Sequence, residues 1–287
     1  MKRAINIKKD LVQIHTVEDI TEVFESIASI KISKIRDRVV ASKDFFADLW
    51  QTYQELRIDP EEQLKRPHRA QKDRSVFVVI TSEGRLSGDV IGQMKEAVLS
   101  ALDSPKTTDI VVLGYQGAIQ FSQQGIEMLQ AYHLPEADAQ FGVSEVIELL
   151  QEYDQISVFY QTYESLRVQK IARIELISTI RELGDEADVV QQEEGAEIVS
   201  SRSYIFEPSI AEIADYLESM MMEVALTQII MESKLAQYAS RFNAMNAAKH
   251  RAHELTKEYS RQFHRAKRNE SDERLKETMK IVIGRRA

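Results

Sequence analysis

Apolar residues near the start of the chain recur every three or four positions. From residue 28 onward the spacing alternates between four and three, with one serine in the series: Ala28, Ile32, Ile35, Val39, Ser42, Phe46, Leu49, Tyr53 and Leu56. An upstream run at Val17, Ile20, Phe24 and Ile27 has similar spacing but is displaced by one residue. A repeat averaging 3.5 residues predicts a helix that supercoils around another helix. We expect this helix to end at Asp59-Pro60, with a one-residue slip near position 27.

The end of the chain carries a looser version of the same repeat. Its apolar or small positions are Ile210, Ile213, Leu217, Met220, Val224, Met231, Leu235, Tyr238, Phe242, Met245, Ala252, Tyr259, Phe263 and Ala266. Neither proline nor glycine occurs from Ser209 to Ile283. An unbroken helix over this stretch would be roughly 110 Å long at 1.5 Å per residue. A helix of that length cannot be buried within its own small domain, so it needs a partner helix, a partner protein, or both.

Between the two helical segments the pattern changes to short apolar runs separated by turns. We expect strands at 76–80, 110–113, 156–160 and 168–177, helices at 89–102, 118–131 and 143–152, and a last strand at 198–206. Alternating strands and helices predict an α/β unit with a parallel core sheet. Residues 184–197 form an acidic loop between glycines, with the composition of a mobile segment.

The predicted fold class is α/β plus a long antiparallel coiled coil. The terminal helices pair, and a small Rossmann-like α/β domain is inserted between them. The expected domains are 1–59 for the first helix, 60–207 for the α/β domain and 208–287 for the second helix. We expect residues 14–57 to pair with the proximal part of the second helix. The second helix would then extend past the first by roughly 30 residues, or about 45 Å.

Composition narrows the possible functions. The chain has no cysteine, which excludes disulfides and thiolate metal sites. Its N-terminus lacks the apolar region of a secretory signal, and no apolar run approaches the roughly 20 residues that cross a bilayer. The net charge is −9, but residues 233–287 hold 14 basic and 6 acidic side chains. A basic distal helix is consistent with a nucleic-acid-binding arm or with a rod surrounded by acidic protein surfaces.

No catalytic centre, cofactor site or metal site is predicted. The segment 81–88 follows a strand as phosphate-binding loops do, but it lacks their glycine-lysine pattern and is better explained as a turn. His250 and His253 have a spacing that can present two metal ligands, yet Lys249 and Arg251 beside them would repel a cation. A solvated basic face is the simpler interpretation. The basic residues between 261 and 268 can contact phosphates or acidic protein equally well.

Several short motifs, in order along the chain, resemble those of the gamma subunit of F-type ATP synthases. These are Thr16-Val17, Ser33-Lys34-Ile35-Arg36, 81–88, 109–117, Ser165 with Gln169, 204–209, 232–234, 239–245, and Ala252 with Glu254-Leu255. The chain departs from the family at Ile20 to Phe24, at Gly84-Arg85, and at Lys267, Arg268 and Asp272. These departures are typical of a divergent member.

The resemblance implies a central stalk without catalytic residues of its own. Its coiled coil would rotate inside a hexamer of alternating alpha and beta subunits, and its α/β domain would contact the epsilon subunit and the membrane c-ring. It would couple transmembrane ion flow to ATP synthesis or hydrolysis at the cytoplasmic face of the membrane, without inserting into the bilayer. The basic distal charge would then match a protein cavity rather than nucleic acid.

The resemblance also implies roles for individual residues. Lys267, Arg268 and Asp272 would lie at the rotor–stator catch contacts. Ile281, Val282 and Ile283 would form an apolar bearing tip, where the lack of hydrogen bonds would leave rotation unhindered. Tyr204 and Glu207 would face the c-ring and epsilon. Two alternatives remain: the rotor of a specialised hydrolysis-directed ion pump or repurposed rotary ATPase, and a free-standing coiled-coil nucleic-acid binder.

Overall fold

The computed structural model describes residues 4–55, 72–84, 89–102, 108–134, 143–180, 182–183 and 210–284. Two helices dominate it, α1 (Ala4–Glu55) and α7 (Ile210–Gly284). The α7 helix is continuous over 75 residues, as expected for a segment without interior proline or glycine. The predicted ends of the α/β domain, near residues 60 and 207, lie outside the described residues, and so do the acidic loop 184–197 and the expected strand 198–206.

The chain divides into two compact units. The first contains the described residues of 1–29 and 241–287, so it consists of the beginning of α1 and the end of α7. The second contains the described residues of 30–240. It holds the remaining parts of both helices and a five-stranded sheet with its own covering helices.

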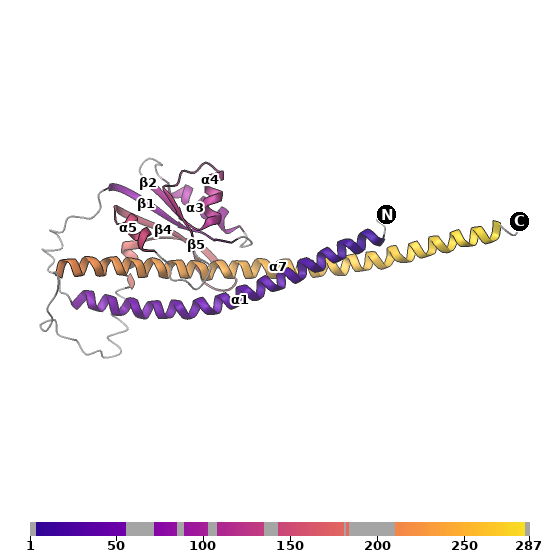
Figure 1. Ribbon diagram of the computed structural model, residues 1–287, viewed down its shortest axis with the longest axis horizontal. Coiled ribbons are helices and arrows are strands. Elements are labelled where there is room, and N and C mark those ends of the chain that lie inside the picture. Colours follow the sequence, from indigo (N-terminus) through magenta and orange to yellow (C-terminus); the bar gives the residue numbers. More distant parts are fainter. Residues whose placement is uncertain are drawn as a thin grey trace. The chain divides into compact units, whose positions relative to one another are not determined.

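The second unit contains a five-stranded sheet (Figure 1). Its strand order is β3-β2-β1-β4-β5, formed by β3 (Gln130–Tyr132), β2 (Thr108–Leu113), β1 (Lys72–Ile80), β4 (Tyr153–Tyr163) and β5 (Gln169–Glu175). The first four strands in this order are parallel, and β5 is antiparallel to β4. The expected parallel core sheet is confirmed, and the edge strand β5 is added to it in the antiparallel direction. A short turn at 164–168 returns the chain beside β4, whereas a parallel neighbour needs a crossover.

Helices cover both faces of this sheet (Figure 1). The helices α3 (Val90–Ala101) and α4 (Tyr115–Gln123) pack on one face, against Phe77, Val79 and Phe159. On the other face, α5 (Ser144–Leu150), α1 and α7 pack against alternate strand residues such as Val78 and Val158. Both faces are buried, which explains why the central strands are continuous apolar runs rather than alternating ones.

The expected strands at 76–80, 110–113 and 156–160 are confirmed, and so are the helices at 89–102 and 143–152. The strand expected at 168–177 ends at Glu175, and residues 176–180 are helical. The helix expected at 118–131 is wrong in its second half. It ends at Gln123, just before Gly125 with its positive φ of 72°, and Leu129 then donates a backbone hydrogen bond to Ile110. This contact starts the edge strand β3, which is too short for its pattern to be recognised in the sequence.

The turn after β1 is tied tightly to the end of β2. The hydroxyl of Thr81 lies 3.2 Å from the Leu113 carbonyl and 3.1 Å from the Gly114 carbonyl. Gly114 has a φ of 121°, and a Cβ there would lie 2.5 Å from the backbone oxygen of Thr81. Glu83 accepts a hydrogen bond from the Leu134 amide. These contacts support a structural turn at residues 81–84, whereas the rest of the expected turn, 85–88, lies outside the described residues.

We expect Gly114→Ala to destabilise the second unit by about 2–5 kcal/mol, because it combines backbone strain with a steric clash. Gly125→Ala is the matched control, because Gly125 also has a positive φ but no atom lies within 4 Å of the added methyl group. That change should cost only about 1–2 kcal/mol. Urea denaturation followed by circular dichroism measures both, and equal losses would show that the clash with Thr81 is unimportant.

Candidate functional site

The first unit is an antiparallel helix pair with a regular seam. On α1 the seam residues are Ala4, Ile7, Leu11, Ile14, Glu18, Thr21, Glu25 and Ala28, all buried or half-buried. On α7 they are Met245, Lys249, Ala252, Thr256, Tyr259, Phe263, Ala266 and Glu270, again all buried or half-buried. Spacings of three and four alternate without interruption on both helices. This is the 3.5-residue repeat of a coiled coil.

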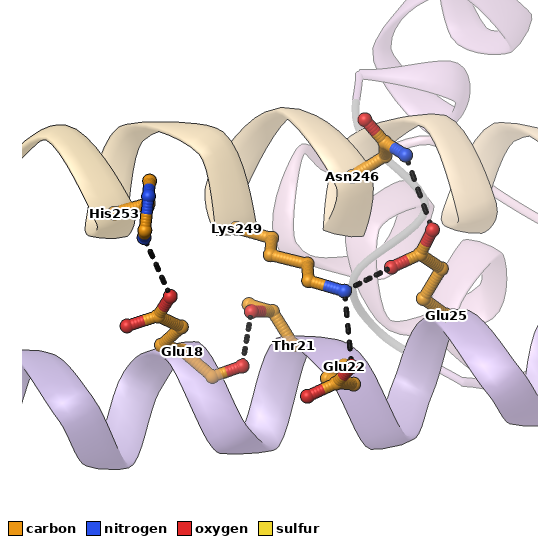
Figure 2. Close-up of polar contacts among 7 residues, drawn as sticks. All are labelled: Glu18, Thr21, Glu22, Glu25, Asn246, Lys249 and His253. Carbon is orange, nitrogen blue, oxygen red and sulfur yellow. Dashed lines mark hydrogen bonds and ion pairs between the residues drawn. The ribbon is translucent and has the colours of Figure 1, made fainter.

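Polar side chains occupy the middle of the α1 seam. Glu18, Thr21 and Glu25 follow one another at seam positions, where most coiled coils carry apolar residues. The carboxylates of Glu18 and Glu25 face polar residues of α7 (Figure 2). The hydroxyl of Thr21 donates to the Glu18 carbonyl of its own helix, at 2.8 Å. This stretch of the pair is therefore joined by hydrogen bonds and charge rather than by apolar packing.

Lys249 is the centre of this polar stretch. Its Nζ lies 3.2 Å from an oxygen of Glu22 and 3.4 Å from an oxygen of Glu25. The other oxygen of Glu25 accepts a hydrogen bond from the Asn246 amide, at 3.1 Å. The hydrogen bond to Glu22, followed by the interactions with Glu25, raises the pKa of Lys249. The lysine therefore stays charged throughout the physiological range.

Glu18 is shared by two histidines. Its Oε1 lies 3.0 Å from Nδ1 of His253 on α7, and its Oε2 lies 3.6 Å from Nδ1 of His15 on α1. In the sequence, His253 and His250 have the spacing of a metal-binding pair. In the structure His253 instead faces a carboxylate of the opposite helix. Among the described residues, no group of histidines and carboxylates is arranged to hold a metal ion.

The one-residue slip expected near position 27 is wrong. The seam runs through Glu18, Thr21, Glu25 and Ala28 without interruption, and the residue before each of them belongs to the apolar run identified from the sequence. Of that run, Val17, Ile20 and Ile27 are 50%, 47% and 42% exposed, and Phe24 is half-buried. Apolarity alone identified the wrong face, because charge pairs replace apolar packing at this point. The alternating spacing of three and four residues, continued without interruption from Ala4 to Ala28, is the sequence signal that identifies the correct face.

The helix pair extends further than expected. The backbone N of Ala4 donates to an oxygen of Glu270, at 2.9 Å, so pairing includes the first described turn of α1 rather than beginning near residue 14. Only the residues from 271 to Gly284 follow this contact, about half of the expected overhang. The side chains of residues 271–280 are all exposed.

The residues proposed for the catch contacts all lie on exposed surface of α7. Lys267, Arg268 and Asp272 are exposed, and His264, Lys267, Arg268 and Ser271 line a shallow hollow. Residues 281–283 are helical, but their side chains lie outside the described part, as do Tyr204 and Glu207 altogether. The roles implied for all these residues remain predictions.

Comparison with known proteins gives one consistent result. The family model described as ATP synthase matches residues 4–286. The ATP synthase gamma chain of Geobacter sp. strain M21 is 24% identical over 278 residues, covering 91% of each chain. That of Desulfitobacterium hafniense is 24% identical over 280 residues and covers 93% of each.

Solved structures show the same fold. A chain of the Euglena gracilis mitochondrial ATP synthase, from a structure of OSCP, F1 and c-ring, matches with a TM-score of 0.64 and 13% identity. The match covers 97% of this chain and 94% of that one. A chain of the central stalk and c-ring structure from Tetrahymena thermophila matches with a TM-score of 0.58 and 17% identity, covering 80% and 99%. Among the described residues, none of the helices is long and apolar enough to cross a bilayer.

Proposed function

The chain belongs to the ATP synthase gamma family, and from this premise we propose that it is the central rotor stalk of an F-type ATP synthase. The family match over residues 4–286 carries this conclusion. Two paired terminal helices and an inserted α/β domain agree with it, because solved chains from ATP synthase stalks share this fold. The chain is a non-catalytic component, and the chemistry of ATP takes place in other subunits.

The distal end of α7 would turn inside a ring of alternating alpha and beta subunits. Its exposed side chains include Arg261, Arg265, Lys267 and Arg268, and a basic surface suits a cavity lined by acidic protein. Such rim contacts act mainly through long-range charge and depend on salt. We assign Lys267, Arg268 and Asp272 to contacts with the ring, and residues 281–283 to the bearing.

The α/β domain would form the foot of the stalk. In this proposal it contacts the epsilon subunit and the c-ring, with Tyr204 and Glu207 at that contact, and the complex lies at the cytoplasmic face of the membrane. Ion flow through the ring would turn the foot, and α7 would carry the rotation to the catalytic subunits. The continuity of α7 supports this role, since one helix passes through both compact units.

Affinity purification of the tagged chain from its own cells tests the assignment. We expect alpha and beta subunits in equal amounts, each in excess over this chain, together with epsilon, and the c-ring when the membrane is solubilised gently. The isolated chain should bind neither DNA nor RNA at low salt, where phosphate contacts are strongest. Recovery of the chain without alpha and beta, or with bound nucleic acid, would overturn the proposal.

A further inference from the structure

The middle of α1 carries two competing seams. The observed seam, Glu18, Thr21, Glu25 and Ala28, faces α7 and is polar at its first three positions. The apolar stripe, Val17, Ile20, Phe24 and Ile27, has the same spacing and lies one residue earlier at every position. With 3.6 residues per turn, a rotation of α1 by about 100° would exchange the two faces. The sequence therefore encodes two rotational settings for this part of the helix.

Apolar burial alone would favour the other setting. Rotation would bring isoleucine, valine and phenylalanine to α7 in place of carboxylates, and burial of apolar side chains is the dominant favourable term in such contacts. The observed setting nevertheless leaves Ile20 47% exposed and Thr21 only 5% exposed. Seam residues towards the N-terminus, such as Ile7 and Leu11, favour the observed setting in their own turns of the same helix.

The observed setting makes polar contacts that a rotated α1 would lose. Lys249 lies between Glu22 and Glu25, Asn246 donates to Glu25, and His253 meets Glu18. Polar pairs in a seam are known to determine which of several apolar arrangements a coiled coil adopts. Here Glu18, Glu25 and Lys249 are half-buried, whereas Glu22 and His253 are exposed. An alternative setting would leave these groups without their partners, a cost that opposes rotation.

We propose that these polar contacts form a rotational lock, with Lys249 at its centre, that holds the middle of α1 in the observed setting. Lys249 is then a positioning residue whose role is to choose between two faces of α1. The lock keeps the apolar stripe turned away from α7. This inference concerns the chain itself and does not depend on the assignment to a rotary complex.

Disulfide trapping in the isolated full chain can distinguish the two settings, because the sequence contains no cysteine. Thr21 and Ala252 are 5% and 4% exposed, and the flanking contacts of Glu18 with His253 and of Glu22 with Lys249 place them opposite each other. The pair Thr21→Cys with Ala252→Cys reports the observed setting. The pair Ile20→Cys with Ala252→Cys reports the rotated one. Each disulfide needs Cα atoms within about 7 Å.

With Lys249 in place, we expect the Thr21→Cys/Ala252→Cys pair to form its disulfide rapidly and the Ile20→Cys/Ala252→Cys pair to form it slowly. We call the oxidation rate of the first pair divided by that of the second the rate ratio. Adding Lys249→Glu should reduce this ratio by about tenfold, because three carboxylates then repel one another across the seam. The neutral change Lys249→Met should give a smaller reduction. Reversing all the charges, with Glu22→Lys, Glu25→Lys and Lys249→Glu together, should restore the ratio.

Lys257→Glu is the matched control, since it makes the same change at an exposed position of the same helix. It should leave the ratio unchanged. Circular dichroism verifies that each variant is helical, and Lys249→Met supplies the answer if Lys249→Glu does not fold. An unchanged ratio in Lys249→Met and Lys249→Glu would overturn the proposal. So would failure of the reversed-charge variant to restore it, because the lysine would then act through packing alone.

Discussion

Shortening the chain to residue 270 should abolish most ATP synthesis by the assembled complex while leaving the chain folded. The side chains of residues 271–280 are all exposed, and the contact between Ala4 and Glu270 is retained. The melting temperature should therefore remain unchanged, and far-UV circular dichroism should lose only the helical signal of residues 271–284. We expect the rate of synthesis under an ion gradient to fall by about tenfold or more, equivalent to about 1.4 kcal/mol in activation free energy.

A longer truncation, to residue 256, is the structural control. It also removes Tyr259, Phe263 and Glu270 from the seam with α1, so this chain should melt at a lower temperature than the first. A chain that no longer folds when cut at residue 270 would contradict the conclusion that the distal segment depends on partners. Undiminished synthesis by that chain would contradict its assignment to the ring contacts.

Leu226→Ala should be among the most destabilising single changes on α7, costing about 2–5 kcal/mol. The side chain is fully buried, and it belongs to the core cluster that α7 forms with the sheet and with α1 in the second unit. Truncation to alanine leaves a cavity that the surrounding strands cannot close. Because alanine has the highest helix propensity, the loss reports packing rather than helix formation.

Leu275→Ala is the matched control on the same helix, with a leucine that is 62% exposed. It should change the free energy of unfolding by no more than about 0.5 kcal/mol. Chemical denaturation of both variants measures the difference. A similar cost at the two positions would show that α7 is not anchored to the sheet through its apolar face.

The elements with strong patterns were predictable from the sequence. The absence of proline and glycine predicted the continuous helix α7, and apolar runs predicted the buried strands β1, β2 and β4. The edge strand β3 was missed because three residues show no periodicity, and its position depends on a contact with β2 that is distant in sequence. The antiparallel direction of β5 was missed because strand composition does not specify direction.

The candidate site was harder to predict for a physical reason. Apolar periodicity identifies a seam only where the seam is apolar, and Glu18, Thr21 and Glu25 break that condition. The pairing of Glu22 with Lys249 joins residues that lie 227 positions apart, and nothing local in either segment indicates the other. On α7, by contrast, Met245, Ala252, Tyr259 and Phe263 were recognised as seam residues, because apolar and aromatic side chains still mark that face.

The pairing of the two chain ends has a consequence for synthesis on the ribosome. The contact of Ala4 with Glu270 spans 266 residues, so the beginning of α1 cannot pair until nearly the whole chain has been translated. At 5–20 residues per second, Ile7 and Leu11 wait roughly 10–50 s for their partners on α7. During that time the nascent chain exposes a long apolar face, a target for chaperones, while the strands of the central sheet are being completed.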